Sequence, residues 1–200
     1  IILKAKYLTI SSSNIIGVIT CAFIFYSCNP TKTLKPDEIF LQKVKITTDN
    51  KRIDKDELYR INKQNSNKKI LGVFRFHLGA YNLFHKRVEN LKENIGEAPA
   101  IYDSLSAIKS VNQISLYLNN RGFFHNNVTF STKKHKNKVK LHFDISSGTP
   151  YTINELTYKF QDPSLGGYVL YKKDNSLIKP GDNFDVAVLD KERERIKKVL

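Results

Sequence analysis

The residue best placed to carry chemistry in this chain is Cys28, which stands where a basic and then apolar N-terminal segment gives way to polar sequence. Lys4 and Lys6 supply a positive start, a short apolar stretch follows, and Ser27 is the small residue that a signal peptidase requires before its cut. A thiol at the first position after that cut can accept a lipid. We therefore predict a lipoprotein signal peptide over residues 1–27, with lipidation such as palmitate at Cys28.

Two alternatives stay open for this segment. The apolar stretch Ile15–Phe25 is shorter than the roughly 20 residues that span a bilayer, but adding residues 7–14 would make a marginal, uncleaved anchor. Cys28 could instead be an ordinary small apolar residue, since lipoprotein signals usually carry Leu where this chain has Phe25. Cys21, the only other cysteine, would leave with the segment, so no disulfide is predicted in the mature chain.

The chain is strongly basic, with 33 Lys and Arg against 19 Asp and Glu and a formal net charge of +14. This charge favours an anionic membrane surface or an acidic protein partner, and the export signal argues against nucleic acid. The alternative interpretation is a solubilising surface with no specific partner.

The sequence offers no catalytic or metal-binding constellation. The histidines follow neither a two-histidine helical motif nor a cysteine pairing, and Gly166-Gly167 alone is too short for a phosphate loop. Asp54 and Glu57 are better explained as helix-capping residues. We predict a protein that is not an enzyme and has no cofactor and no metal. The histidines are His77, His85, His125, His135 and His142.

The elements that must position any site begin near residue 39. Apolar and polar residues alternate over 40–48, which predicts a strand. Asp54 fits the N-cap of a following helix, with Glu57 at the N3 position of a capping box. A second helix is predicted over Ser106–Asn120, and Gly122 fits its C-cap.

Between the two helices lies the apolar stretch 68–84, whose spacing predicts a helix interrupted by glycines, followed by an inserted loop near 86–100. Alternation over 128–132 and 139–145 then predicts a hairpin joined by the lysine-rich turn 133–138. The order strand, helix, helix, strand, strand predicts an α+β fold, a small mixed sheet covered by two helices.

The pattern restarts after Pro150. Tyr151–Phe160 predicts another extended stretch, residues 162–172 a short helix, 179–182 a turn, and Asp185 the cap of a final helix. We expect a second unit of the same type, incomplete at Leu200. The predicted domains are a signal peptide at 1–27, a lipidated tether at 28–38, a first domain at 39–149 and an incomplete second domain at 150–200.

Several motifs in this order resemble one family over about residues 40–200. They are residues 67–72 with Tyr81-Asn82, Gly96–Pro99 with Tyr102-Asp103, Tyr117–Phe124, Gly148–Ile153, and Lys179–Asp182 with Glu192-Arg193. The chain is similar to the periplasmic polypeptide-transport-associated (POTRA) domains of the BamA and TamA outer-membrane assembly proteins. The likeness is greatest to the lipidated TamA-like branch of Bacteroidota.

The resemblance implies an outer-membrane lipoprotein with tandem POTRA-like units facing the periplasm. It implies a role in assembly or translocation of outer-membrane proteins, by scaffolding and β-strand addition ahead of a C-terminal β-barrel beyond Leu200. The implied partners are the outer membrane through the lipid anchor, unfolded outer-membrane proteins and a TamB-like periplasm-spanning protein. The alternative is a lipid-anchored module that binds a glycan or a peptide, without a barrel, with Phe74–Phe84 lining its site.

Two candidate sites follow from these expectations. The outer hairpin strand Val128, Thr129, Phe130, Ser131 and Thr132 is the candidate edge for client binding, although nearby lysines could simply blunt it against unwanted pairing. The turn residues Lys133, Lys134, Lys136 and Lys138 are the candidate contact with an anionic surface, and a solvated hairpin tip is the alternative.

Overall fold

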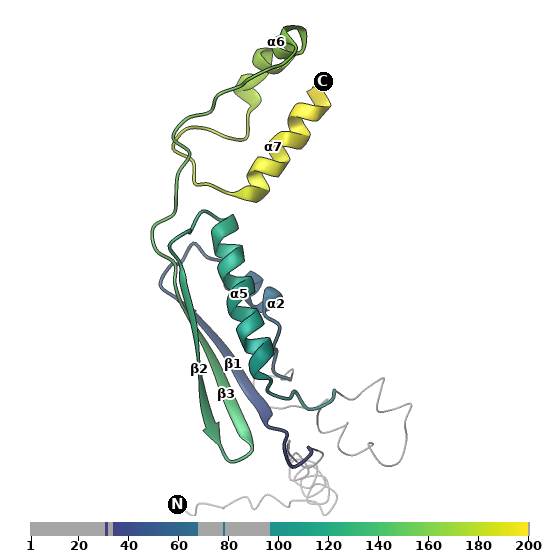
Figure 1. Ribbon diagram of the computed structural model, residues 1–200, viewed down its shortest axis with the longest axis vertical. Coiled ribbons are helices and arrows are strands. Elements are labelled where there is room, and N and C mark those ends of the chain that lie inside the picture. Colours follow the sequence, from purple (N-terminus) through teal and green to yellow (C-terminus); the bar gives the residue numbers. More distant parts are fainter. Residues whose placement is uncertain (1–30, 32–33, 68–77, 79–96, 200) are drawn as a thin grey trace, which may run out of the picture. The chain divides into compact units, whose positions relative to one another are not determined.

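A computed structural model describes residues 31, 34–67, 78 and 97–199 of the chain. The predicted signal peptide and Cys28 lie outside the described residues, as do the stretch 68–84 apart from Leu78 and residues 86–96 of the predicted loop 86–100. In chain order the elements are β1 (Phe40–Thr48), α2 (Lys55–Ile61), α5 (Ser104–Asn120), β2 (Asn127–His135), β3 (Lys138–Ser146), α6 (Pro163–Tyr171), the 3-10 helix η1 (Lys173–Asn175) and α7 (Val186–Val199) (Figure 1).

The strands form one three-stranded sheet in the order β1-β3-β2. β2 and β3 are an antiparallel hairpin. Thr47 Oγ1 donates to Asp144 Oδ1 at 2.7 Å, and the Asp49 N–H donates to the Ile145 carbonyl at 3.3 Å. Because the residue numbers increase in the same direction along both strands, β1 runs parallel to β3. The predicted α+β fold with a small mixed sheet is confirmed.

By internal contacts the chain divides into two compact units, one of residues 1–42, 66–102 and 134–139 and the other of residues 43–65, 103–133 and 140–200. The domain boundaries expected from the sequence stay a prediction.

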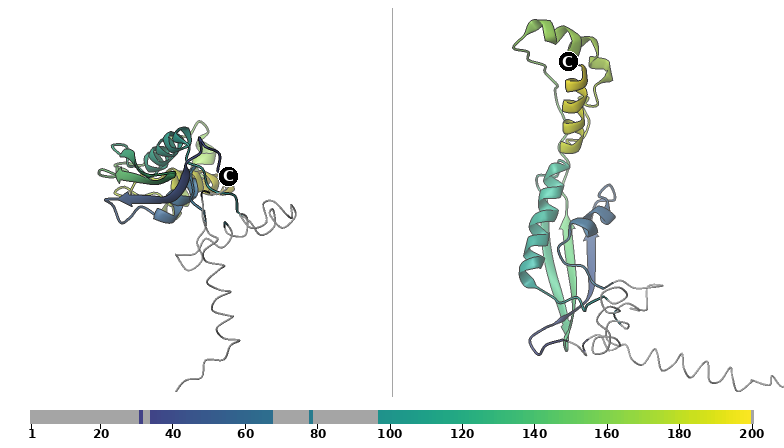
Figure 2. Two further views of the ribbon diagram at one scale, coloured as in Figure 1. Left: turned by 90° about the horizontal axis from the view of Figure 1, so that it is seen from below. Right: turned by 90° about the vertical axis from the view of Figure 1, so that its right-hand side faces the viewer.

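Of the buried apolar side chains that the structure describes, most belong to the second unit. Along β3, Leu141, Phe143 and Ile145 are buried and alternate with exposed or half-exposed residues, so one face of the strand is covered. Helices α2 and α5 lie beside the sheet (Figure 1), and α5 runs along the strands in the turned view of Figure 2. Leu58, Ala107, Ser110, Ile114 and Leu118 are their buried residues.

Local sequence explains where these helices begin and end. Asp54 caps α2 by accepting from the N–H groups of Asp56 and Glu57, as predicted. α5 begins two residues earlier than predicted because Asp103 accepts from the N–H groups of Leu105 and Ser106. The sequence analysis named Asp103 in a family motif but did not predict it as a cap. Gly122 follows α5 at φ +84°, the left-handed conformation expected of it.

In the first unit, a buried asparagine joins two backbone segments that are far apart in sequence. The Asn67 side chain donates from Nδ2 to the Ala98 carbonyl at 2.7 Å and accepts at Oδ1 from the Ala100 N–H at 2.8 Å. Next to it, Phe40 and Ile101 form an antiparallel bridge. Both hydrogen-bonding groups of the amide are thus used where water is excluded.

In residues 151–199 the predicted short helix is α6 and the predicted final helix is α7, whose Asp185 cap accepts from the Ala187 N–H at 2.8 Å. The predicted extended stretch Tyr151–Phe160 is not a strand. It makes only an isolated bridge, Thr152 with Asn183, because within the described residues no partner strand continues the ladder. Among the described helices, none combines the length and the hydrophobicity needed to cross a membrane.

Candidate functional site

Strand β2 occupies an edge of the sheet. β3 pairs with one side of it, and no strand in the described part of the chain pairs with the other side. Most of the strand is exposed. Val128 is buried and Phe130 is half-buried against the Phe143 ring, and every other residue of β2 is exposed. The structure thus places the predicted segment Val128–Thr132 on an accessible strand edge.

The hairpin register identifies which peptide groups face outward. Only Lys136 and Asn137 separate β2 from β3, so His135 lies opposite Lys138 as the first hydrogen-bonded pair. Such pairs alternate along the hairpin, which leaves Val128, Phe130 and Thr132 at positions whose N–H and C=O groups point away from β3. These are the groups an added strand would bond.

The opposite edge of the sheet, on β1, is occupied at several points. In the first unit, the Leu41 N–H donates to the Ala100 carbonyl at 2.7 Å. In the second unit, the Ile46 N–H donates to the Tyr59 hydroxyl at 3.1 Å. β2 is therefore the more accessible of the two edges within the described residues.

The lysines that were expected to form one turn are distributed over three elements. Lys133 and Lys134 belong to β2, Lys136 is in the turn, and Lys138 begins β3. The predicted six-residue turn is wrong because exposed lysines can continue an edge strand without cost in burial. Lys136 has a φ of +51°, a left-handed conformation that its side chain disfavours.

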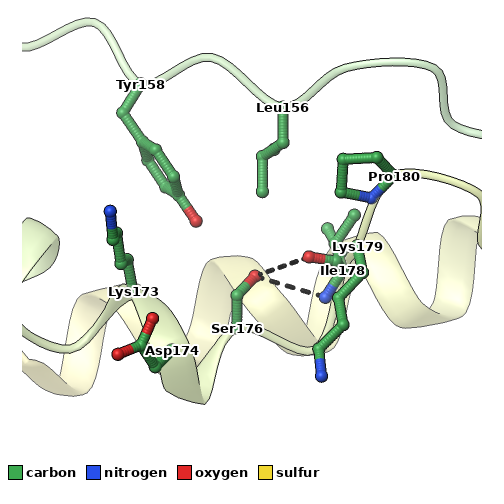
Figure 3. Close-up of a pocket in the computed structure, with 8 residues that line it drawn as sticks. All are labelled: Leu156, Tyr158, Lys173, Asp174, Ser176, Ile178, Lys179 and Pro180. Carbon is green, nitrogen blue, oxygen red and sulfur yellow. Dashed lines mark hydrogen bonds between the residues drawn. The ribbon is translucent and has the colours of Figure 1, made fainter.

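A second candidate feature is an open cavity of about 410 Å³ in residues 156–180. In Figure 3 the Tyr158 hydroxyl and the Leu156 side chain point toward the space above Ser176. The Tyr158 oxygen is buried and has no hydrogen-bond partner among the described residues. The residues that line the cavity are Leu156, Tyr158, Lys173, Asp174, Ser176, Ile178, Lys179 and Pro180.

The floor of this cavity is fixed by Glu192 of α7, which is 3 % exposed. Its carboxylate accepts from the Ser176 hydroxyl at 2.9 Å, from the Leu177 N–H at 3.0 Å and from the Arg195 guanidinium at 2.7 Å. The bonds from Arg195 above all, then those from Leu177 and Ser176, outweigh burial and lower the pKa of Glu192 to about 2. The sequence analysis named Glu192 only within a family motif and did not predict its burial or its partners, since these depend on residues distant in the chain.

Ser176 lies beside a carboxylate, since its hydroxyl donates to Glu192 at 2.9 Å. That carboxylate is a weak general base, because the bonds from Arg195 hold its pKa at about 2. In the part of the chain that the structure describes, no three His, Cys, Asp or Glu side chains gather as metal ligands.

The loop after α5 meets residues 151 and 184–185 inside the second unit. Arg121 pairs with Asp185 at 2.6 Å and lies over the Tyr117 ring. The Gly122 carbonyl accepts from the Tyr151 N–H at 2.9 Å, and the Phe184 N–H donates to the Tyr151 carbonyl at 2.9 Å. This contact positions the backbone that follows the sheet.

Residues 39–148 match the family model described as POTRA, surface antigen variable number repeat. No curated protein matches the chain.

Proposed function

Because this chain belongs to the POTRA family, we propose that it acts as a scaffold in the assembly of outer-membrane proteins, adding an extended client segment to the edge of β2 that no described strand occupies. POTRA domains are scaffolding modules rather than enzymes, which fits binding groups without a catalytic set.

The observation that carries the proposal is the difference between the two sheet edges. β1 is bonded along its outer side by Ala100 and by the Tyr59 hydroxyl, whereas Val128, Phe130 and Thr132 on β2 have outward peptide groups. In strand addition these groups supply the affinity, and alternate side chains supply a modest selectivity. Such a site suits many unfolded clients.

We further propose that the chain is lipidated at Cys28 and held at the outer membrane with its domains in the periplasm, as in the TamA-like branch of the family. The sequence around Cys28 supports this proposal: a basic start, an apolar stretch and Ser27. Two or more acyl chains hold a protein to a membrane stably, whereas one chain binds reversibly. In this setting the clients are unfolded outer-membrane proteins, and a TamB-like protein is the expected partner across the periplasm.

The test is photo-crosslinking to a urea-unfolded outer-membrane protein, with a benzophenone amino acid at Thr129 of β2 and, in a control variant, at Lys45 of β1. We expect the client adduct from position 129 alone. Thr132→Pro removes an outward N–H without removing a bond to β3, so it should abolish the adduct. Thr132→Val keeps that N–H and should preserve the adduct. Equal adducts from Thr132→Pro and Thr132→Val would contradict strand addition.

The alternative, a lipid-anchored ligand-binding module, now rests on the cavity at Tyr158. The segment Phe74–Phe84 that was expected to line its site lies outside the described residues, apart from Leu78. The buried Tyr158 hydroxyl lacks a partner, and a ligand could provide one. Glycan or peptide binding that Tyr158→Phe weakens and Thr132→Pro leaves unchanged would favour this alternative.

A further inference from the structure

Three lysines lie side by side across the outer face of the sheet. His135 of β2 lies opposite Lys138 of β3, and two residues further along each strand Lys133 lies opposite Lys140. The hydrogen bond from Thr47 to Asp144 shows that Thr47 of β1 lies beside Asp144 of β3. Four residues earlier on each parallel strand, Lys43 therefore lies beside Lys140. We call Lys43, Lys133 and Lys140 the lysine row.

The burial pattern supports this alignment. Lys43 and Lys45 are exposed while Val44 and Ile46 are buried, and Lys140 is exposed while Leu141 is buried. All three residues of the lysine row are exposed and point to the face that the helices do not cover. Adjacent strands are about 4.8 Å apart, so the three ammonium groups stand on neighbouring positions of one flat surface.

No carboxylate of the described residues neutralises the lysine row. The ion pairs among the described residues all involve cations outside the lysine row. The two acidic side chains at the far end of β3 are already engaged, Asp144 with Thr47 and Asp49 with the Ser147 N–H. Like charges directly opposite in a sheet destabilise it.

Protection of the sheet edge does not account for the whole row. Lys133 is on an edge strand, where lysines discourage unwanted pairing, but Lys140 is on the central strand, which has no free edge. A function that uses positive charge explains a lysine at the centre of the face.

We propose that the lysine row binds the phosphate groups of an anionic phospholipid surface and lays the outer face of the sheet against it. The face carries Thr129, Ser131, His142 and Asp144 around the row. Among the described strand residues on this face none is Phe, Tyr or Trp, the aromatic anchors on which protein interfaces depend. Lysine supplies mobile point charges that suit many separate phosphates rather than one oriented carboxylate.

This surface is separate from strand addition, because it uses the outer face of the sheet and not the β2 edge. A client could therefore pair with β2 while the face lies on lipid. The inference stands or falls independently of the proposed function.

The test is co-sedimentation of the full chain with vesicles of neutral phosphatidylcholine, or of phosphatidylcholine with three parts in ten of phosphatidylglycerol. The triple variant Lys43→Gln, Lys133→Gln, Lys140→Gln is compared with Lys55→Gln, Lys109→Gln, Lys191→Gln, which removes three exposed lysines elsewhere. Each variant lowers the net charge from +14 to +11 (14 − 3). Binding to neutral vesicles measures what the apolar N-terminal segment contributes, since all variants share it.

We expect the row variant to reduce partitioning onto anionic vesicles roughly 100-fold, which corresponds to about 1 kcal/mol for each lysine. The matched control should fall less than about 3-fold, and Lys→Arg at the three row positions should retain binding, since charge alone carries the attraction. Circular dichroism checks that each variant is folded.

Three results would overturn the proposal. Equal losses in the row and control variants would mean that net charge, not its placement, governs binding. Equal partitioning of the unchanged protein onto neutral and anionic vesicles would mean that the lysine row is not used. Tight row-dependent binding of a polyglutamate peptide, with no preference for anionic vesicles, would assign the face to an acidic protein.

Discussion

The carboxylate of Glu192 on helix α7 accepts a hydrogen bond at 3.0 Å from the backbone N–H of Leu177, which follows the 3-10 helix η1. Through this bond and that from Ser176, a single buried side chain holds the 176–178 backbone against a helix that begins eight residues later in the chain.

The low pKa of Glu192 predicts a pH dependence of stability. Hydrogen bonds from Arg195 first, and then from Leu177 and Ser176, lower this pKa from 4.5 to about 2. The carboxylate therefore contributes about 3 kcal/mol that is fully present above pH 4.5 and is lost as the pH falls toward 2. Urea unfolding from pH 7 to pH 3 should show this slope in the unchanged protein and lose it in Glu192→Gln.

The matched control for that experiment is Glu194→Gln. Glu194 pairs with Lys197 at 2.7 Å, but both side chains are more than 60 % exposed. Surface pairs of this kind contribute roughly 0–1 kcal/mol, so the slope should stay as in the unchanged protein. A slope lost equally in both variants would contradict the role assigned to Glu192.

Among the described glycines, Gly122 should be the least tolerant of a side chain. It has a φ of +84°, and an added Cβ would lie 2.7 Å from the Phe184 carbonyl oxygen. Gly122→Ala should lower the free energy of unfolding by about 2 kcal/mol or more, measured by urea unfolding.

Two further glycines separate the causes of that loss. Gly181 has a φ of +91° with open space around it, so Gly181→Ala should cost about 1 kcal/mol from conformation alone. Gly167 lies in α6 with nothing near it, and Gly167→Ala should raise stability by about 0.5–1 kcal/mol. An equal change in the free energy of unfolding in all three variants would contradict the clash expected between a side chain at position 122 and the Phe184 carbonyl oxygen.

Asn67 should be essential to the local order of residues 98–100. Asn67→Ala leaves the Ala98 carbonyl and the Ala100 N–H without their partner, a loss of roughly 2 kcal/mol for buried groups. Hydrogen exchange of the Ala100 amide should accelerate accordingly. The control variant Asn112→Ala, at an exposed position of α5, should leave the exchange rate of the Ala100 amide unchanged. If the Ala100 amide exchanged as fast in this variant as in Asn67→Ala, general destabilisation would be the cause.

Lys136 predicts a stabilising substitution. Its φ of +51° suits glycine better than lysine, so Lys136→Gly should raise the free energy of unfolding by about 0.5–1 kcal/mol. Lys138→Gly, at the start of β3, removes a side chain from an ordinary strand position and should lower stability by a similar amount. Thermal unfolding of the two variants should therefore shift in opposite directions.

The sequence predicted the elements whose signals are local. Alternation located β1, β2 and β3, Asp54 and Asp185 marked the starts of two helices, and a glycine marked the end of α5. Each signal depends only on residues within a few positions of one another, so no knowledge of the packing was needed.

The features that sequence could not supply depend on distant partners. Tyr151–Phe160 alternates like a strand, but a strand also needs a neighbour to bond, and only Asn183 bridges to Thr152. The lysine row likewise appears only once β1 is aligned beside β3, since Lys43 and Lys140 are almost a hundred residues apart. For Asn67 and Glu192, burial and partners are set by the tertiary fold, and composition is silent about them.

The parallel alignment of β1 with β3 also constrains the order of folding. Thr47 meets Asp144 across 97 residues, whereas β2 and β3 are joined by two residues and can pair as soon as both exist. Closing so long a loop is slow and costs entropy that a hairpin avoids. Of the three described strands, β1 is made before β2 and β3 and is therefore the last to find its place in the sheet.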